Sequence, residues 1–283
     1  MNSNAILITG ASTGIGKACA LYLDQLGFQV FAGVRKQADA DKLAAQGSEK
    51  LTPVQLDVVD NDSISAAVKL ITQSVENRGL MGLVNNAGLA SAGPMEFLPV
   101  EEIRRVFEVN LLGQIAVTQA FLPLLRENQG RIVNMSSISG LIAAPFAGPY
   151  TISKFAFESF SDVLRRELSP WNIHVAIIEP GRINTPIWEK SFGVVENILA
   201  QLPAKAHELY GQAFETSIKA TLKSKQSGTG PEAVARAVTH ALTARKPKLR
   251  YPVGMDAKLV TLFASVFPAR WMDALLAKQR GIE

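Results

Sequence analysis

A tyrosine and a lysine stand four positions apart in the stretch PYTISKF, at Tyr150 and Lys154. On a helix this spacing places the two side chains on one face, close enough to influence each other. A free phenol has a pKa of about 10, and a nearby ammonium lowers it by favouring the phenolate. The pair is either an acid–base centre or a solvated helix face, and the rest of the chain must decide. Thr151 and Ser153, at i+1 and i+3, need not share the reacting face.

A glycine-rich segment, TGASTGIG at residues 9–16, lies between an apolar run and a helical one. Its three glycines, Gly10, Gly14 and Gly16, permit a tight turn and a close approach of the backbone to a ligand. The helix that follows offers free N–H groups and a partial positive charge to a diphosphate. A tight turn without a ligand is the alternative. The position at the first strand–helix junction favours a dinucleotide site.

The end of the second apolar run bears on the choice of cofactor. Sites for NAD usually carry an acidic residue here for the ribose 2′-hydroxyl, whereas an arginine suits a 2′-phosphate. This chain has Val34 in that place, followed by Arg35 and Lys36. The two cations favour NADP(H) over NAD(H), the alternative being a solvated basic pair.

Short β-rich apolar runs alternate with segments of helical period. We expect helices at 16–27, 62–79 and 103–128, and strands at 5–9, 29–34, 51–58, 82–87, 131–136, 174–180 and, more weakly, 249–254. Strands too apolar to have a wet face, flanked by helices, indicate a parallel sheet covered on both sides. The prediction is an α/β fold: a single doubly wound (Rossmann) domain over residues 1–283, with a seven-stranded, mainly parallel sheet and helices on both faces.

Two regions depart from this alternation. Residues 188–230 form a long helical insertion after the sixth strand, and residues 255–283 form a C-terminal helical extension broken at Pro268. Helices that simply face the core are the alternative reading for both. Because long insertions in compact domains are often functional, we expect the first to be a substrate-binding lid.

Composition narrows the range of partners. The chain has 283 residues, of which 47% are hydrophobic and 19% charged, and 29 basic against 25 acidic residues give a net charge of +4. This small excess, with no basic run interleaved with aromatic residues, argues against a nucleic-acid surface. The three histidines, His174, His207 and His240, have no metal-ligand spacing, so no metal site is expected.

The single cysteine, Cys19, excludes an intramolecular disulfide. The first residues, MNSNAILITG, leave no room for a signal peptide before the first expected strand. No uncharged apolar run approaches the roughly 18–20 residues of a spanning helix. We therefore expect no transmembrane segment and a cytoplasmic location.

Seven short motifs, in one order along the chain, resemble those of the short-chain dehydrogenase/reductase family. They are TGASTGIG (9–16), LDV (56–58), NNAG (85–88), VN (109–110), NMSS (134–137), YTISK (150–154) and PGRINT (180–185). The resemblance covers about residues 4–187, and it is specific because the motifs occur together. It implies a Rossmann fold and hydride transfer with a nicotinamide cofactor.

The resemblance also implies a catalytic tetrad of Asn110, Ser137, Tyr150 and Lys154. The family's serine lies 13 residues before its tyrosine, which selects Ser137 rather than Ser136. Tyr150 would give its proton to a carbonyl oxygen, or take one from an alcohol. Lys154 would favour the phenolate and bind the nicotinamide ribose, while Ser137 holds the substrate oxygen. Asn110 would keep a helix locally open, so that a water connects the lysine to solvent.

The cofactor residues follow from the same motifs, together with the two cations above. They are Gly10, Ser12, Thr13, Gly14, Ile15, Gly16, Arg35, Lys36, Asp57, Val58, Asn86, Ala87, Gly88, Tyr150, Lys154, Pro180, Gly181, Ile183 and Thr185. The resemblance assigns the adenine to Asp57 and the nicotinamide carboxamide to Ile183 and Thr185. Arg182 departs from many relatives, which have an uncharged residue there, and receives no role.

Apolar residues suggest the class of substrate. The stretch 138–149 is apolar, and so are Ile187, Trp188, Phe192, Val194 and Val195 in the insertion. If they line a pocket, a hydrophobic alcohol or ketone such as a steroid, retinoid or alicyclic compound is favoured over a sugar. FAGVRK and EPGRINTPI resemble the steroid and retinol dehydrogenase branch.

Three other functions compete with this one. A reductase of 3-oxoacyl thioesters and a reductase of small xenobiotic ketones are the alternatives among enzymes. The alternative from another class is a non-catalytic NADP(H)-sensing protein, although such proteins commonly lack the tyrosine or the lysine.

Members of the family usually associate through the helices that carry the asparagine and the tyrosine. The apolar face of residues 115–125 is compatible with a dimer or tetramer. The tail carries Phe263, Phe267 and Trp271, which suit a membrane surface, but we favour its folding over the pocket or contacting a second subunit.

Overall fold

The computed structural model describes residues 3–76, 78–185, 193, 195, 198–225 and 228–280. Within these residues seven strands form one sheet in the order β3-β2-β1-β4-β5-β6-β7, and every neighbouring pair is parallel. The strands are β1 (Ala5–Ile8), β2 (Gln29–Val34), β3 (Leu51–Gln55), β4 (Gly82–Asn85), β5 (Arg131–Met135), β6 (His174–Pro180) and β7 (Arg250–Val253). The predicted doubly wound sheet is confirmed. The strand order reverses between β1 and β4, where sheets of this kind bind ligands at their carboxyl ends.

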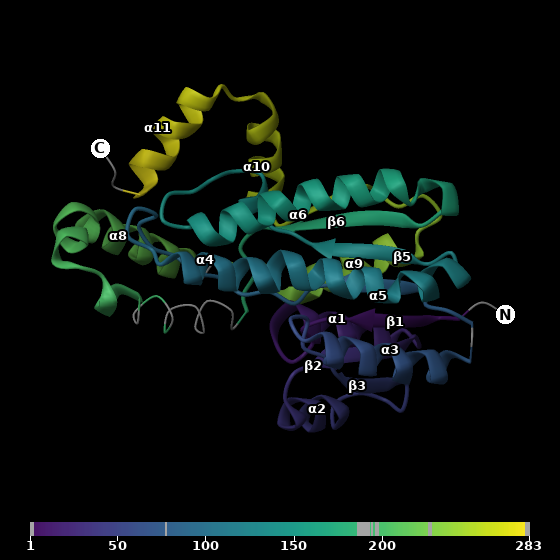
Figure 1. The fold of residues 1–283 in the computed structure, drawn as a ribbon. Coiled ribbons are helices and arrows are strands. Elements are labelled where there is room, and N and C mark those ends of the chain that lie inside the picture. Colours follow the sequence, from purple (N-terminus) through teal and green to yellow (C-terminus); the bar gives the residue numbers. More distant parts are fainter. Residues whose placement is uncertain are drawn as a thin grey trace.

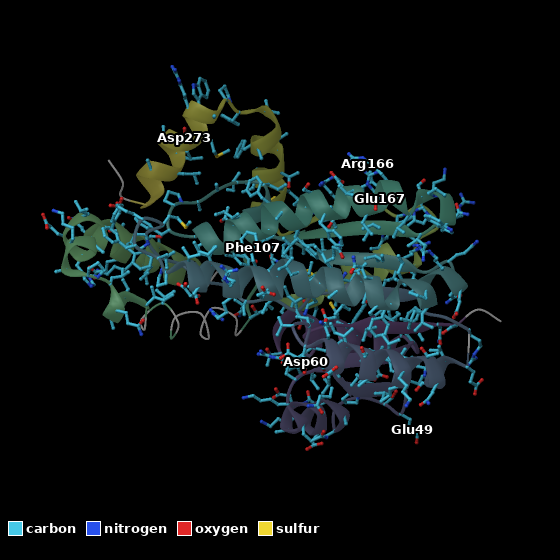
Figure 2. The ribbon with its side chains drawn as sticks, viewed as in Figure 1. Glu49, Asp60, Phe107, Arg166, Glu167 and Asp273 are labelled. Carbon is cyan, nitrogen blue, oxygen red and sulfur yellow. The ribbon has the colours of Figure 1, made fainter. Side chains whose placement is uncertain are left out.

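Helices cover both faces of the sheet (Figure 1). One layer contains α1 (Gly14–Gln25), α2 (Gln37–Ala44) and α9 (Pro231–Thr243); the other contains α3 (Asn61–Val75), α5 (Gly113–Glu127) and α6 (Gly148–Glu167). Successive residues of a strand point to opposite faces. In β1, Ile6 and Ile8 join the first layer, and Ala5 and Leu7 join the second. This alternation of fully buried apolar residues is why the strands read as continuous apolar runs.

The predicted helix at 103–128 is continuous but not uniform. It consists of α4 (Val100–Phe107), a π-helical turn η1 (Glu108–Leu112) and α5. Of the described helices, this Val100–Glu127 stretch alone is long and apolar enough to span a membrane, with a mean hydropathy of 1.2. The expectation of no transmembrane segment, made from the lack of an uncharged apolar run, stays a prediction, because these criteria concern length and composition only. Core helices meet them too, and this one buries Val117 and Phe121 against the sheet.

The regions outside the alternation are largely helical. α8 (Ala204–Lys225) lies within the insertion, and α10 (Met255–Val266) and α11 (Ala269–Arg280) form the tail on either side of Pro268. Figure 1 shows α11 beyond the sheet layers, on the same side of the molecule as α8, which it contacts. The roles assigned to residues 188–230 and 255–283 stay predictions.

Candidate active site

The glycine loop joins β1 to α1 at the carboxyl edge of the sheet. Gly10 and Gly14 have φ values of +65° and +59°, a region that favours glycine. A Cβ on Gly10 would lie 2.7 Å from the Cα of Ala87, so the loop packs directly on the segment after β4. The first turn of α1, which the structure describes in full, carries no acidic residue. Its partial positive charge is therefore available to an anion such as a diphosphate.

Asn86 holds this loop in place. Its Nδ2 donates hydrogen bonds to the carbonyl oxygens of Thr9 (2.9 Å) and Gly10 (3.2 Å). In return the Thr9 hydroxyl accepts from the backbone N–H groups of Asn86 (2.8 Å) and Ala87 (2.9 Å). The side chain of Asn86, predicted at the cofactor site, thus builds the cradle by binding the backbone of the loop.

The adenosine end of the predicted site has exposed cations. Arg35 and Lys36 follow β2 and are both solvent-exposed. Asp57 follows β3, and its Oδ1 accepts from the backbone N–H of Val59 at 3.2 Å, which fixes the turn. Val58 is buried against α5, where a Cβ on Gly113 would lie 2.7 Å from the Val58 carbonyl oxygen. The Asp57 turn and the two cations thus follow β3 and β2, the two strands on one side of β1, which leads into the glycine loop.

The PGRINT loop follows β6, which lies on the other side of β1 from β2 and β3. The N–H of Gly181 donates to the carbonyl oxygen of Val253 at 2.9 Å, and the N–H of Arg182 donates to Asp256 Oδ2 at 2.7 Å. Ile183 and Thr185 are buried. The first turn of α10 therefore positions this loop. Arg182 contributes its backbone to the contact, while its side chain stays exposed.

Tyr150 and Ser137 come together from different elements. Ser137 follows β5 and caps a short 3₁₀ helix, η2 (Ile138–Gly140), with its Oγ accepting from the N–H of Ser139 at 3.1 Å. Tyr150 lies in the first turn of α6. Burial raises the pKa of the Tyr150 phenol, and a hydrogen bond with Ser137 opposes the shift. This direction is opposite to the lowering that the sequence predicted from the nearby lysine.

Lys154 lies one turn further along α6 and is 5% exposed. Its Nζ donates a hydrogen bond to the carbonyl oxygen of Met135 at 2.7 Å and lies 5.7 Å from the centroid of the Tyr150 ring. Burial lowers the pKa of Lys154 to about 8, and the negative charge of Glu158 opposes the shift. Burial therefore favours loss of the proton from this amine, and the charge of Glu158 favours keeping it.

Asn110 sits at the centre of the π-helical turn and is fully buried. Its Nδ2 donates to the carbonyl oxygen of Leu89 (2.9 Å) and to the Oγ of Ser153 (3.0 Å), and its Oδ1 accepts from the N–H of Leu89 (2.9 Å). Ser153 Oγ donates to the carbonyl oxygen of Tyr150 at 2.7 Å. Asn110 thus connects the loop after β4 to the helix that carries the tyrosine.

Ser153 has a structural role that its spacing from Tyr150 did not indicate. Its side chain does not point toward the reacting phenol, but it joins two of the predicted tetrad residues through hydrogen bonds. Position i+3 turns away from the tyrosine's ring and toward η1. The sequence did offer one signal for this role. Ser153 is a small hydroxyl residue directly before Lys154, on a helix that was expected to pack closely.

A buried polar chain fixes the strands beneath the site. Asn85 Nδ2 donates to Thr118 Oγ1 (2.8 Å) and Asn134 Oδ1 (2.9 Å), and Asn134 Nδ2 donates to Ser161 Oγ (2.8 Å). Asn85 and Asn134 are register partners in β4 and β5. The NNAG and NMSS motifs therefore tie the two strands to α5 and α6 and hold Ser137 in register with the helices.

An aromatic cluster lies between α8 and the loop that precedes α6. The Phe146 ring is 5.2 Å from Phe214 and 6.3 Å from Tyr210, measured between centroids, and Tyr210 also packs on Phe97. The Tyr210 hydroxyl donates to Glu96 Oε2 at 2.7 Å. Of the predicted wall residues in the insertion, Val195 is buried in this cluster. The others, Ile187, Trp188, Phe192 and Val194, lie outside the described residues.

The chain is similar to known proteins along most of its length. The family model described as short chain dehydrogenase matches residues 4–193. Mouse retinol dehydrogenase 5 is 42% identical over 277 residues, covering 96% of this chain and 87% of the relative. Bovine 17-beta-hydroxysteroid dehydrogenase type 6 is 39% identical over 278 residues, with the same coverage.

Solved structures share the fold. A short-chain dehydrogenase from Streptomyces avermitilis superposes with a TM-score of 0.76 at 27% identity, covering 98% of this chain and 94% of that one. A short chain dehydrogenase from Burkholderia cenocepacia, solved in complex with NADP, has a TM-score of 0.74 at 23% identity, covering 97% and 98%.

Proposed function

The chain belongs to the short-chain dehydrogenase/reductase family, in its steroid and retinol dehydrogenase branch, and we propose that it is an NADP(H)-dependent oxidoreductase that interconverts a hydrophobic alcohol and the matching ketone or aldehyde. One observation carries the proposal. The Tyr150 phenol has a hydrogen bond with Ser137, and the buried ammonium of Lys154 lies 5.7 Å from the centroid of its ring.

The chemistry follows from these positions. In reduction, the hydroxyl groups of Ser137 and Tyr150 bond the substrate's carbonyl oxygen, and Tyr150 gives up its proton as that oxygen becomes a hydroxyl. In oxidation, the Tyr150 phenolate accepts the alcohol's proton. The ammonium of Lys154 stabilises the phenolate in both directions by its charge. When bound, the nicotinamide ring supplies or accepts the hydride.

The choice of NADP(H) rests on Arg35 and Lys36. Both are exposed directly after β2, and the position before them is Val34 rather than an acid. An arginine here suits a ribose 2′-phosphate, while an acid would suit a free 2′-hydroxyl. The positive end of α1 and the glycine loop are suited to the diphosphate.

The aromatic cluster supports an apolar substrate. Phe146 precedes Tyr150 by four residues and packs on Tyr210 and Phe214 of α8, so an apolar cluster forms where the chain enters the helix that carries the tyrosine. The related proteins named above are a retinol dehydrogenase and a 17-beta-hydroxysteroid dehydrogenase, both of which are named for large apolar alcohols. We therefore favour a steroid, retinoid or alicyclic alcohol.

Self-association as a dimer or tetramer is part of the proposal. A groove between α5 and α6 is lined by apolar side chains such as Leu122 and Phe160 together with polar ones such as Arg126 and Glu167. On the outer face of α6, Phe155 and Val163 are more than two-fifths exposed. Joining two such faces would bury them. We also propose a cytoplasmic location, which the fully buried, unpaired Cys19 suits and cell fractionation would test.

The direct test is a panel of retinoid, steroid and alicyclic alcohols and ketones, followed by the absorbance of the reduced nicotinamide with both NADP(H) and NAD(H). We expect turnover of apolar members with NADP(H) preferred, and none with sugars. Turnover confined to 3-oxoacyl thioesters or small xenobiotic ketones would overturn the substrate class. Binding of NADP(H) without turnover of any compound would identify a cofactor-sensing protein instead.

A further inference from the structure

A group of charged side chains begins one helical turn after Lys154 and joins α6 to β6 and β7. Among the described residues, the guanidinium of Arg250, at the start of β7, contacts three carboxylates. Its Nη2 donates to Glu158 Oε2 at 3.1 Å and to Asp162 Oδ2 at 3.2 Å. Its Nε lies 3.1 Å from Glu179 Oε1, an ion pair rather than an aligned hydrogen bond. Asp162 also pairs with Arg165 Nη2 at 3.3 Å, so within the described part of the chain Arg250 is the cation that Glu158 and Glu179 share.

Two of these carboxylates are buried, so their pKa values depend strongly on the charges around them. Glu179, on β6, is fully buried, and Glu158 is 7% exposed. A buried carboxylate that is not fully compensated holds its proton more tightly. Burial raises the pKa of Glu179 to about 7, with the charge of Glu158 adding to the shift and Arg250 opposing it. Burial also raises the pKa of Glu158, while the Ser136 hydroxyl and Arg250 oppose it.

Glu158 connects this group to the site. It follows Lys154 by four residues on α6, so the two side chains lie on one helical face. A Cβ on Gly140, next to the Ser137 turn, would lie 3.0 Å from Glu158 Cγ and 3.1 Å from the Lys154 carbonyl oxygen. The serine turn therefore packs onto α6 at this point, and water is largely excluded.

The other elements packed on α6 add little charge at Lys154. From α6 itself the facing groups are Tyr150, Glu158 and Asp162, from β6 Glu179 and from β7 Arg250. On α4, Glu102 pairs with Arg105 at 2.7 Å, and Glu101 and Arg104 are exposed. η1 contributes the neutral Asn110 and the exposed Glu108. Neither η2 nor the 3₁₀ turn η3 (Ser169–Trp171) contains a charged residue. Glu158 is thus the nearest charged neighbour along the helix.

We propose that Glu158 is a positioning residue whose carboxylate, kept ionised by Arg250, maintains the buried ammonium of Lys154 in its charged form. The inference rests on the proposed function, because the charge on Lys154 matters there for stabilising the Tyr150 phenolate. Glu158 itself touches neither substrate nor cofactor. It acts through the lysine.

The test is a titration of the Lys154 Nζ by ¹⁵N and ¹³C NMR in the full-length protein, with the signal assigned from its loss in Lys154→Met. In Glu158→Gln we expect the midpoint to fall by about one pH unit or more, since an opposite charge within reach shifts a pKa by roughly that much. Glu158→Asp should recover most of the shift. The matched control is Asp162→Asn, which removes another carboxylate from Arg250 at the next turn of α6 and should leave the midpoint unchanged.

Arg250→Met tests the same inference through a different residue, and it can be used if Glu158→Gln does not fold. Without the guanidinium, Glu158 takes up a proton and the Lys154 midpoint should again fall. An unchanged midpoint in a folded Glu158→Gln or Arg250→Met protein would overturn the inference. The titration needs no substrate, so a shift without turnover would keep the inference and refute only the proposed function. With turnover, the alkaline limb of kcat against pH should move down by the same interval as the NMR midpoint.

Discussion

The side-chain amide of Asn110 lies 3.0 Å from the hydroxyl oxygen of Ser153, within hydrogen-bond distance. This contact joins the π-helical turn Glu108–Leu112 to α6 and leads through Ser153 to the carbonyl oxygen of Tyr150. Two residues of the predicted tetrad are therefore held by a third side chain between them. π-helical turns of this kind often occur at functional sites.

Ser153→Ala should destabilise the protein. The substitution leaves the Nδ2 of Asn110 with one partner fewer in a fully buried position, which costs about 1–3 kcal/mol. Turnover should also fall, because the backbone at Tyr150 loses a fixed contact. Chemical denaturation and steady-state kinetics measure the two effects.

Thr151→Val is the matched control for that experiment. The Thr151 hydroxyl is buried without a hydrogen-bond partner among the described residues, so a methyl group in its place should be neutral or stabilising. If Thr151→Val and Ser153→Ala lose the same stability, the Asn110–Ser153 hydrogen bond does not account for the loss at position 153.

Arg35→Ala should weaken the binding of NADPH far more than that of NADH. The guanidinium is expected to bind the 2′-phosphate, which NADH lacks. Isothermal titration calorimetry with both cofactors measures the difference. Arg236→Ala, at an exposed position of α9, changes the net charge equally and should leave both affinities unchanged. Equal weakening of NADPH and NADH by Arg35→Ala would refute the phosphate assignment.

Stability should fall as the pH rises from about 4.5 to 7, in part because of Glu179. Its pKa in the folded state is raised to about 7 from 4.5, so the folded protein binds more protons than the unfolded chain in that window. The loss from this one group approaches about 3 kcal/mol, at about 1.4 kcal/mol for each pH unit. Glu179→Gln cannot titrate and should flatten the curve.

Denaturant unfolding at several pH values measures the stability of the wild type and of Glu179→Gln. Parallel curves for the wild type and Glu179→Gln would contradict the raised pKa. Asp162→Asn removes a carboxyl whose pKa is lowered by its arginine partners, against an opposing effect of burial. That variant should therefore keep the wild-type fall between pH 4.5 and 7.

Val163→Glu should convert the proposed oligomer to a monomer. Val163 is 45% exposed on the face of α6 beside the groove between α5 and α6, and a buried, unpaired carboxylate there would oppose association. Light scattering after size exclusion gives the mass. Val59→Glu places the same change at a 50% exposed valine after β3 and should leave the mass unaltered. A wild-type protein that is monomeric at micromolar concentration would disprove the self-association.

The fold could be predicted because its signals are local. Apolar runs such as AILI and HVAIIEP are buried on both sides of a parallel sheet, so their composition reveals them without knowledge of their neighbours. The glycine loop carries its own conformational signature at Gly10 and Gly14.

Other features could not be predicted because they depend on long-range contacts. Arg250 and Glu158 are 92 residues apart, and no spacing in the sequence brings β7 to the back of α6. The raised pKa of Tyr150 likewise depends on burial by several elements, whereas its spacing from Lys154 pointed the other way. Ser153 needed the position of η1 before its bond to Asn110 could be seen.

The central claim is that the Tyr150 phenol is the group that exchanges a proton with the substrate. Tyr150→Phe keeps the ring and removes only the hydroxyl, and Tyr22→Phe on α1 makes the same change away from the site. The decisive measurement is kcat of each variant on the best apolar alcohol, alongside the Kd for NADPH. We predict a loss of at least about 100-fold for Tyr150→Phe, with the Kd nearly unchanged and no loss for Tyr22→Phe. Turnover of Tyr150→Phe close to that of the wild type would contradict the account.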